Sequence, residues 1–268
     1  MTSDVRIRAL ARPRPCAQNS AGPFALAALL AVTLCGLLWM PPVHQDPAYH
    51  SFADQRAWFG IPNFWNVLSN LPFLAVAAVG AWVLRRGPAF VTGWERAAHW
   101  LLVVGAAAVA LGSGYYHWAP DSSTLFWDRL PMTLMFMSLL AVTLGERLSL
   151  RWGGLLLLPL IVLGVVSVLN WRLTGDLRFY GAVQFFPMLA LPLLLILCPG
   201  RYTSQRGTWW MIALYVAAKL LELNDAGLAA YLPGGGHPWK HLAAALALLA
   251  YFAGIARRRL DESAMQSA

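Results

Sequence analysis

The sequence predicts an all-α, polytopic membrane protein, and three observations lead to this fold class. Of its 268 residues, 59% are hydrophobic and only 12% are charged, whereas a soluble domain carries roughly 25% charged residues. Apolar stretches long enough to cross a hydrocarbon core of about 30 Å recur along the whole chain. The connectors between them are short, and they are charged or rich in Pro and Gly, which leaves no room for a soluble domain.

Eight stretches qualify as spans by length and composition. They cover residues 24–40, 63–84, 96–117, 128–145, 151–170, 180–197, 208–223 and 238–256. The first follows four arginines, so a cleaved secretory signal peptide is an alternative for that segment. The sequence WMPPVHQ after it is a poor cleavage site, and we therefore favour an uncleaved transmembrane helix.

The net charge of +8 is explained by topology rather than by a nucleic-acid partner. Arginines gather before the first span, after the second, fourth and sixth spans, and after the last one. The alternate connectors carry few basic residues. Because basic loops stay on the cytoplasmic side, this distribution predicts that both termini are cytoplasmic.

Polar residues inside spans are informative because each is costly in lipid unless it is paired or functional. His117 closes the third span, Asp128 opens the fourth, and His237 and His241 open the eighth. On the predicted topology, all four lie at the non-cytoplasmic ends of their helices. We therefore expect three helix ends to meet at one depth near the outer face.

The spacing of these residues predicts a metal site. His237 and His241 are four residues apart, which places two imidazoles on one face of a helix. A third imidazole from His117 would complete a three-histidine set with an open position, as in catalytic zinc sites. Ser113 lies one turn before His117 on the same face, and Asp128 is the nearest carboxylate. The alternative is that these histidines are only polar residues at the membrane interface.

The same segments carry a resemblance. The sequence GSGYYH, then DRLPM beginning eleven residues after His117, and then HPWKH in the last span are similar to the alkaline ceramidase family. This family belongs to a superfamily of seven-helix membrane hydrolases and receptors. NFWNVLSNLPF at residues 63–73 also resembles the first core helix of the family. The resemblance divides the chain into an N-terminal part (1–48) with an extra span, a seven-helix core (49–256) and a C-terminal tail (257–268).

The resemblance implies a function and a role for each residue. His117, His237 and His241 would bind Zn²⁺, Ser113 would help to stabilise the oxyanion, and Asp128 would act as general base and then as general acid. The implied reaction is the attack of a zinc-activated water on the amide of a ceramide-like lipid, which releases a fatty acid and a sphingoid base. Composition and loop plan favour a bacterial inner-membrane protein.

Three questions remain open from the sequence. An ester hydrolase acting on a glycerolipid would use the same site, and a receptor or transporter could use the histidines without catalysis. Eukaryotic members of the family carry an acidic calcium cluster before the first core helix. Here only Asp54 and Asn63 occupy that region, and Ca²⁺ needs six to eight oxygen ligands. The sequence therefore does not favour a calcium site.

Overall fold

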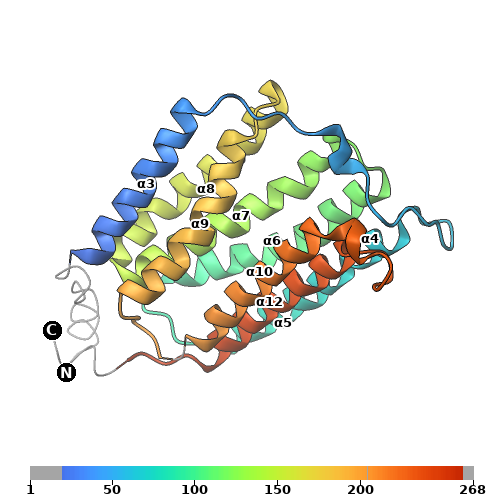
Figure 1. Cartoon of the computed structure of the whole chain (residues 1–268). Coiled ribbons are helices and arrows are strands. Elements are labelled where there is room, and N and C mark those ends of the chain that lie inside the picture. The colour runs from blue at the N-terminus through green and yellow to red at the C-terminus, as the bar shows by residue number, and fades with distance from the viewer. Residues whose placement is uncertain (1–19, 204, 262–268) are drawn as a thin grey trace, which may run out of the picture.

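The computed structural model describes residues 20–203 and 205–261, and within these residues it is built from helices without a β-strand. The long helices form a bundle in which consecutive members run in opposite directions (Figure 1). In chain order the elements are α3 (Ala21–Trp39), the 3₁₀ turn η1 (Pro47–His50), α4 (Phe64–Leu68), α5 (Leu71–Arg85), α6 (Gly93–Trp118), α7 (Ser122–Arg147), α8 (Leu150–Thr174), α9 (Arg178–Leu197), α10 (Arg206–Leu223), α11 (Asp225–Leu228) and α12 (His237–Arg257).

In the described part of the chain, seven helical segments are long and apolar enough to cross a membrane: α3, α4 with α5, α6, α7, α8, α9 and α12. This confirms the predicted fold class, a multi-pass integral membrane protein. The predicted span 208–223 also forms a helix, α10, but α10 is not among the seven. Arg206, Lys219 and Glu222 put three charges into its 18 residues, so length and composition alone do not mark it as a span. α10 instead lies along α12 (Figure 1).

The two helices that carry most of the candidate site begin at well-formed caps. At the start of α6, Thr92 and Glu95 form a capping box, in which each side chain meets the backbone N–H of the other residue. At the start of α7, the Asp121 carboxylate accepts hydrogen bonds of 2.7 Å from the backbone N–H groups of Ser123 and Thr124. The Asp121 cap fixes where the short connector between α6 and α7 ends, and the Thr92–Glu95 capping box fixes the opposite end of α6.

Gly112 sets the closest contact between α6 and α7. A Cβ atom at this position would lie 2.1 Å from the carbonyl oxygen of Trp127 on α7. Only glycine allows this approach, since any side chain would push the two backbones apart. The residues that follow Gly112 and Trp127 are Ser113 and Asp128, so this contact brings the two predicted catalytic side chains together.

Substituting Gly112 by alanine is expected to destabilise the protein by about 1–3 kcal/mol, because an added methyl group must overpack the α6–α7 contact. Thermal unfolding of the detergent-solubilised protein measures this loss. Gly114→Ala is the matched control, since a Cβ atom there meets nothing within 4 Å. In that variant the better helix propensity of alanine should leave stability unchanged or slightly raised. Equal unfolding temperatures for the two variants would contradict the close contact.

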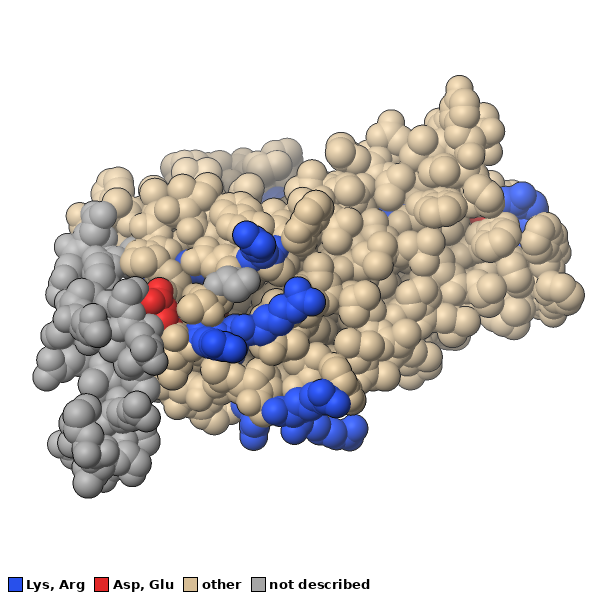
Figure 2. Space-filling view, turned by 90° about the horizontal axis from the view of Figure 1, so that it is seen from below, with Lys and Arg blue, Asp and Glu red and all other residues tan. Residues whose placement is uncertain are grey.

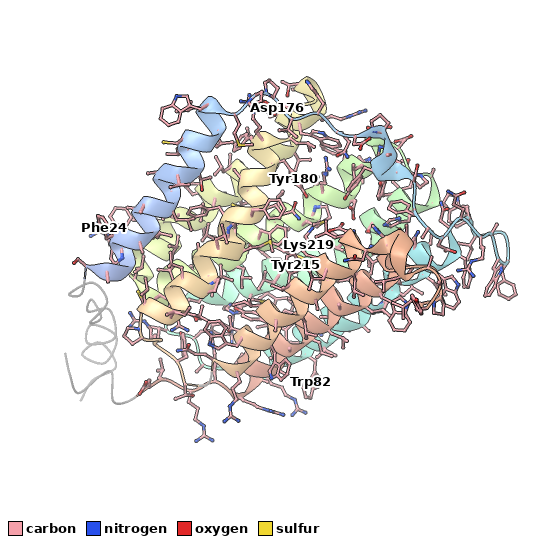
Figure 3. The ribbon with its side chains drawn as sticks, viewed as in Figure 1. Phe24, Trp82, Asp176, Tyr180, Tyr215 and Lys219 are labelled. Carbon is pink, nitrogen blue, oxygen red and sulfur yellow. The ribbon has the colours of Figure 1, made fainter. Side chains whose placement is uncertain are left out.

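The first helix of the described residues, α3, packs against α9, and Arg178 links the two helices. The Arg178 guanidinium pairs with Asp176 at 2.7 Å and donates to the carbonyl oxygens of Leu37 and Met40 at the end of α3. Asp176 lies between α8 and α9 (Figure 3), and the hydrogen bond from Arg178 lowers the pKa of this carboxyl to about 2. The Asp176–Arg178 ion pair, which links α3 to the bundle, therefore stays charged well into acidic pH.

Basic residues gather at one end of the bundle. Figure 2 shows most of the Lys and Arg side chains in view over one half of the face, a broad uncharged region beyond them, and further basic atoms at the far end. At that end, the exposed arginines close α5 (Arg85, Arg86), follow the start of α6 (Arg96) and flank the end of α12 (Arg257, Arg259). Because consecutive helices alternate in direction, the end of α6 and the start of α12 lie at the opposite end.

Candidate metal centre

Three histidines from two helices meet inside the bundle. His117 lies in the last turn of α6, and His237 and His241 lie in the first turns of α12. One nitrogen of each ring lies within 4.8 Å of the others, and the three residues are only 1%, 4% and 5% exposed. The predicted convergence of the three imidazoles is confirmed, and together they can hold a metal ion.

The start of α12 explains why both of its histidines belong to one site. The helix begins at His237, with Pro238 in its first turn, where a proline costs nothing because the N–H it lacks has no helical partner. The ring centroids of His237 and His241 are 4.9 Å apart. The backbone N–H of His237 donates to the carboxylate of Asp225 at 2.8 Å, which fixes the position of this helix terminus.

The separation of two of the ring nitrogens fits a tetrahedral metal. The Nε2 atoms of His117 and His237 are 3.3 Å apart. Two imidazoles that bind one zinc ion at ~2.0–2.1 Å with tetrahedral geometry hold their nitrogens about 3.3–3.4 Å apart. The Nδ1 atom of His117 is buried without a hydrogen-bond partner among the described residues. The His117 ring is therefore not committed to a second partner within the protein.

Ser69 orients the third histidine. Its hydroxyl donates to the carbonyl oxygen of Asn66 at 3.1 Å and lies 2.8 Å from Nδ1 of His241. Since the hydroxyl hydrogen is used by Asn66, the oxygen accepts a hydrogen bond from the N–H at Nδ1. The lone pair of His241 is then on Nε2, the tautomer that a metal ligand with such a partner requires.

Ser69→Ala is expected to weaken metal binding by ~10–100-fold, the usual cost of losing a hydrogen bond that orients a metal ligand. A competition titration with a chromophoric zinc chelator on the purified protein measures this change. Ser69→Thr keeps the hydroxyl and should restore most of the affinity. If alanine and threonine at this position bound the metal as tightly as serine, Ser69 would have no orienting role.

Phe52 covers the cluster. Its ring centroid lies 4.7 Å from that of His117 and 4.3 Å from that of His237, and the side chain is buried. The neighbouring backbone N–H of Ala53 donates to Asp225 at 2.9 Å. Asp225 therefore accepts hydrogen bonds from both the start of α12 and the segment that carries Phe52. The apolar Phe52 ring covers His117 and His237 on the side of this segment.

Ser113 and Asp128, the two predicted catalytic residues, are both buried, and their side chains interact across the α6–α7 contact. Ser113 precedes His117 by four residues on α6, so the two side chains share a face of this helix. Asp128 follows the first turn of α7. A hydroxyl, a carboxylate and three imidazoles are thus gathered at the same end of the bundle.

A charged cluster lies beside α12. Glu222 pairs with Lys219 at 2.7 Å, as the spacing of these residues on α10 predicts, and with Lys240 at 2.5 Å. Lys240 is on α12 between the two histidines. Figure 3 shows Lys219 and Tyr215 one turn apart on α10, on the side that faces α9. Two ammonium groups and one carboxylate leave a positive charge next to the histidines.

The two residues considered for calcium have other partners. Asp54 is fully buried, pairs with Arg56 at 2.9 Å and accepts a hydrogen bond of 2.8 Å from the backbone N–H of Trp65. The Asn63 side chain donates to the carbonyl oxygen of His117 at 2.9 Å. Both residues therefore position the backbone around the histidine cluster.

Sequence reasoning missed the contacts that Ser69, Phe52 and Asp225 make with the histidine cluster. Asn66, Ser69 and Asn70 stand on one face of the predicted second span, and their simplest interpretation is hydrogen bonding between helices. That interpretation holds for Ser69, but its partner is a histidine of the cluster. Nothing in the local sequence marks Phe52, because its contact with His117 comes from a segment more than 60 positions away. Asp225 stands out in sequence only as a charged residue near the end of the predicted seventh span, and its hydrogen bonds with Ala53 and His237 are seen only in the structure.

Comparison with known proteins gives no match, either to a protein-family model, to a curated protein or to a solved structure.

Proposed function

We propose that the chain is a zinc-dependent membrane hydrolase that cleaves the amide bond of a ceramide-like N-acyl lipid. The observation that carries the proposal is the buried set of His117, His237 and His241. The Nε2 atoms of His117 and His237 lie 3.3 Å apart, the separation expected of two ligands on one tetrahedral metal. The Ser113–Asp128 pair at the same end supplies the groups that hydrolysis needs. The sequence resemblance to the alkaline ceramidases supports the amide as the bond that is cleaved.

The donor set favours zinc. Three imidazoles suit zinc, copper, iron or nickel, and the set contains no thiolate or carboxylate that would favour another ion. When bound, zinc would polarise the scissile carbonyl and lower the pKa of a water molecule toward ~7. Ser69 contributes by holding His241 in the tautomer that leaves a nitrogen free for the ion.

The residues of the chain have separate roles in this reaction. Asp128 takes the proton of the attacking water and returns it to the leaving nitrogen, so one carboxyl serves as base and then as acid. The Ser113 hydroxyl donates a hydrogen bond to the oxygen on which negative charge develops. Phe52, packed on His117 and His237, keeps bulk water away from two of the ligands.

A lipid substrate fits the surroundings of the site. The outer surfaces of the helices carry large exposed apolar side chains, among them Leu158 and Val162 on α8 and Leu189 and Ile196 on α9. α9 and α10 meet through isolated side-chain contacts, such as Gln184 with Tyr215 at 3.5 Å. We propose that the acyl chains reach the site sideways from the bilayer, since the histidines are buried inside the bundle.

The membrane orientation is part of the same proposal. The basic end of the bundle would face the cytoplasm of a bacterial cell, with both termini on that side and the histidines near the outer face. Protease accessibility of a tag at the C-terminus, in right-side-out and inverted membrane vesicles, distinguishes this orientation from the reverse one.

The reaction itself is tested by incubating the detergent-purified protein with a ceramide and identifying the products by mass spectrometry. The proposal predicts equal amounts of fatty acid and sphingoid base, and no products from a His117→Ala variant. Hydrolysis of a diacylglycerolipid in place of the ceramide would support the ester-hydrolase alternative. If the metal-loaded protein hydrolysed neither lipid class, the proposal of a hydrolase would be contradicted, and the receptor or transporter alternative would remain.

A further inference from the structure

A second polar site lies at the basic end of the bundle, away from the histidines. A half-open cavity of about 390 Å³, including the solvent at its mouth, is bounded by the ends of α7 and α12 and by the start of α10. Its charged lining residues are Glu146, Arg147 and Arg258. Arg147 and Arg258 are only 5% and 6% exposed, so the lining carries two buried guanidinium groups against one carboxylate.

Arg258 has hydrogen-bonding capacity left over. Its Nη1 donates to Glu146 at 2.6 Å and its Nε donates to the carbonyl oxygen of Ala89 at 2.8 Å. The guanidinium stacks on the rings of Phe90 and Tyr202, 4.3 and 4.0 Å from their centroids. Its Nη2 is buried without a partner among the described residues. An unpaired N–H on a buried cation is costly, and this one belongs to a residue that lines the cavity.

Tyr202 and Tyr251 also line the cavity, but the hydroxyl hydrogen of each is already used in a hydrogen bond within the protein. Tyr202 donates its hydroxyl hydrogen to Glu95 at 2.7 Å. The N–H at Nδ1 of His99 donates to the carbonyl oxygen of Glu95 at 2.6 Å, so Nε2 of His99 accepts from the Tyr251 hydroxyl at 3.0 Å. The remaining donors therefore come from the arginines and from the start of α10.

The start of α10 adds donors that suit an oxyanion. Thr203, Gln205 and Thr208 line the cavity, and α10 begins at Arg206, where the side chain of the N-cap residue Gln205 makes no capping hydrogen bond. The N-terminus of an 18-residue helix presents free backbone N–H groups and a partial positive charge. The Thr203 oxygen accepts from the backbone N–H of Arg259 at 3.1 Å, which leaves its hydroxyl hydrogen for a ligand.

From this combination we propose that the cavity binds a phosphate group. Guanidinium groups, hydroxyls and a helix N-terminus together form the donor set that recognises phosphate, and one anion would balance the excess positive charge of Arg147 and Arg258 in the lining. The cavity opens at the end of the bundle where exposed arginines gather (Figure 2). The phosphate comes either from a phospholipid headgroup of that leaflet or from free inorganic phosphate.

Thermal unfolding of delipidated, detergent-purified protein tests the proposal with two probes. Inorganic phosphate is titrated against chloride at matched ionic strength, and phosphatidic acid is compared with diacylglycerol of the same acyl chains. A saturable rise of several degrees with a phosphate probe is expected, since a ligand that binds only the folded state stabilises it. Stabilisation by inorganic phosphate identifies the free ion as a ligand, and stabilisation by phosphatidic acid alone identifies the lipid headgroup.

Three variants assign any binding to this cavity. Arg258→Gln should weaken phosphate binding about tenfold or more, because it removes a charge-assisted hydrogen bond. Thr208→Val keeps the Arg258–Glu146 pair and should weaken binding to a smaller extent, which provides a test if Arg258→Gln does not fold. Arg257→Gln, an exposed neighbour outside the lining, should bind as the wild type does. No stabilisation by either probe, or equal binding by wild type and Thr208→Val, would overturn the proposal.

Discussion

Replacing His117 by alanine is expected to remove the bound metal from the purified protein. The substitution deletes one of three buried nitrogen ligands, so the loss of affinity should exceed the ~10–100-fold that follows the loss of an orienting partner. Metal content measured by mass spectrometry after purification without chelator should fall from near one zinc per chain to a trace. This result would show that His117 of α6 binds the same metal ion as the HPWKH segment of α12, which begins 120 positions later in the chain.

A second histidine provides the control for this experiment. His44 is exposed and lies outside the cluster, so His44→Ala should keep the full metal content. Equal metal loss in both variants would indicate a general effect of substitution rather than removal of a ligand. Full metal content in His117→Ala would show that His117 does not belong to the binding site.

Asp128→Asn is expected to abolish hydrolysis while leaving the metal in place. Asparagine has the size of aspartate but cannot take a proton from water, and positioned general acid–base groups contribute about 10²–10⁴-fold to rate. Turnover of a ceramide and metal content, measured on the same preparation, separate the two effects. A receptor would have little turnover to lose, so the comparison also distinguishes the functional classes.

Asp121→Asn is the matched control for Asp128→Asn. Asp121 caps the N-terminus of the same helix, and asparagine is an equally good N-cap residue. This variant should therefore fold and turn over substrate normally. Loss of metal together with activity in Asp128→Asn would mean that the carboxylate supports the metal site, and retained activity would remove Asp128 from the reaction.

The sequence was sufficient to predict the histidine cluster because its members lie at helix ends. Helical spacing places His237 and His241 on one face, and the alternation of basic connectors places His117 at the same end of the bundle. Both arguments use only periodicity and charge, which are properties of the sequence. The structure confirms the convergence that they predict.

The remainder of the site depends on contacts that local sequence does not encode. Phe52 lies in the connector before α4 and Ser69 directly follows α4, and both contact the histidines of α12 through tertiary packing. The span expected at 208–223 forms α10, a helix in which Glu222 pairs with Lys219 and also with Lys240 of α12. At the basic end, Arg147 and Arg258 are interpreted from sequence only as topology signals, although both are buried around a cavity.

The most direct test of a zinc hydrolase is the metal content of the wild-type protein, purified in detergent without chelator. The arrangement of His117, His237 and His241 predicts close to one zinc ion per chain. A protein that bound no transition metal, even after incubation with zinc and removal of the excess, would contradict the proposal and leave the histidines as packing residues.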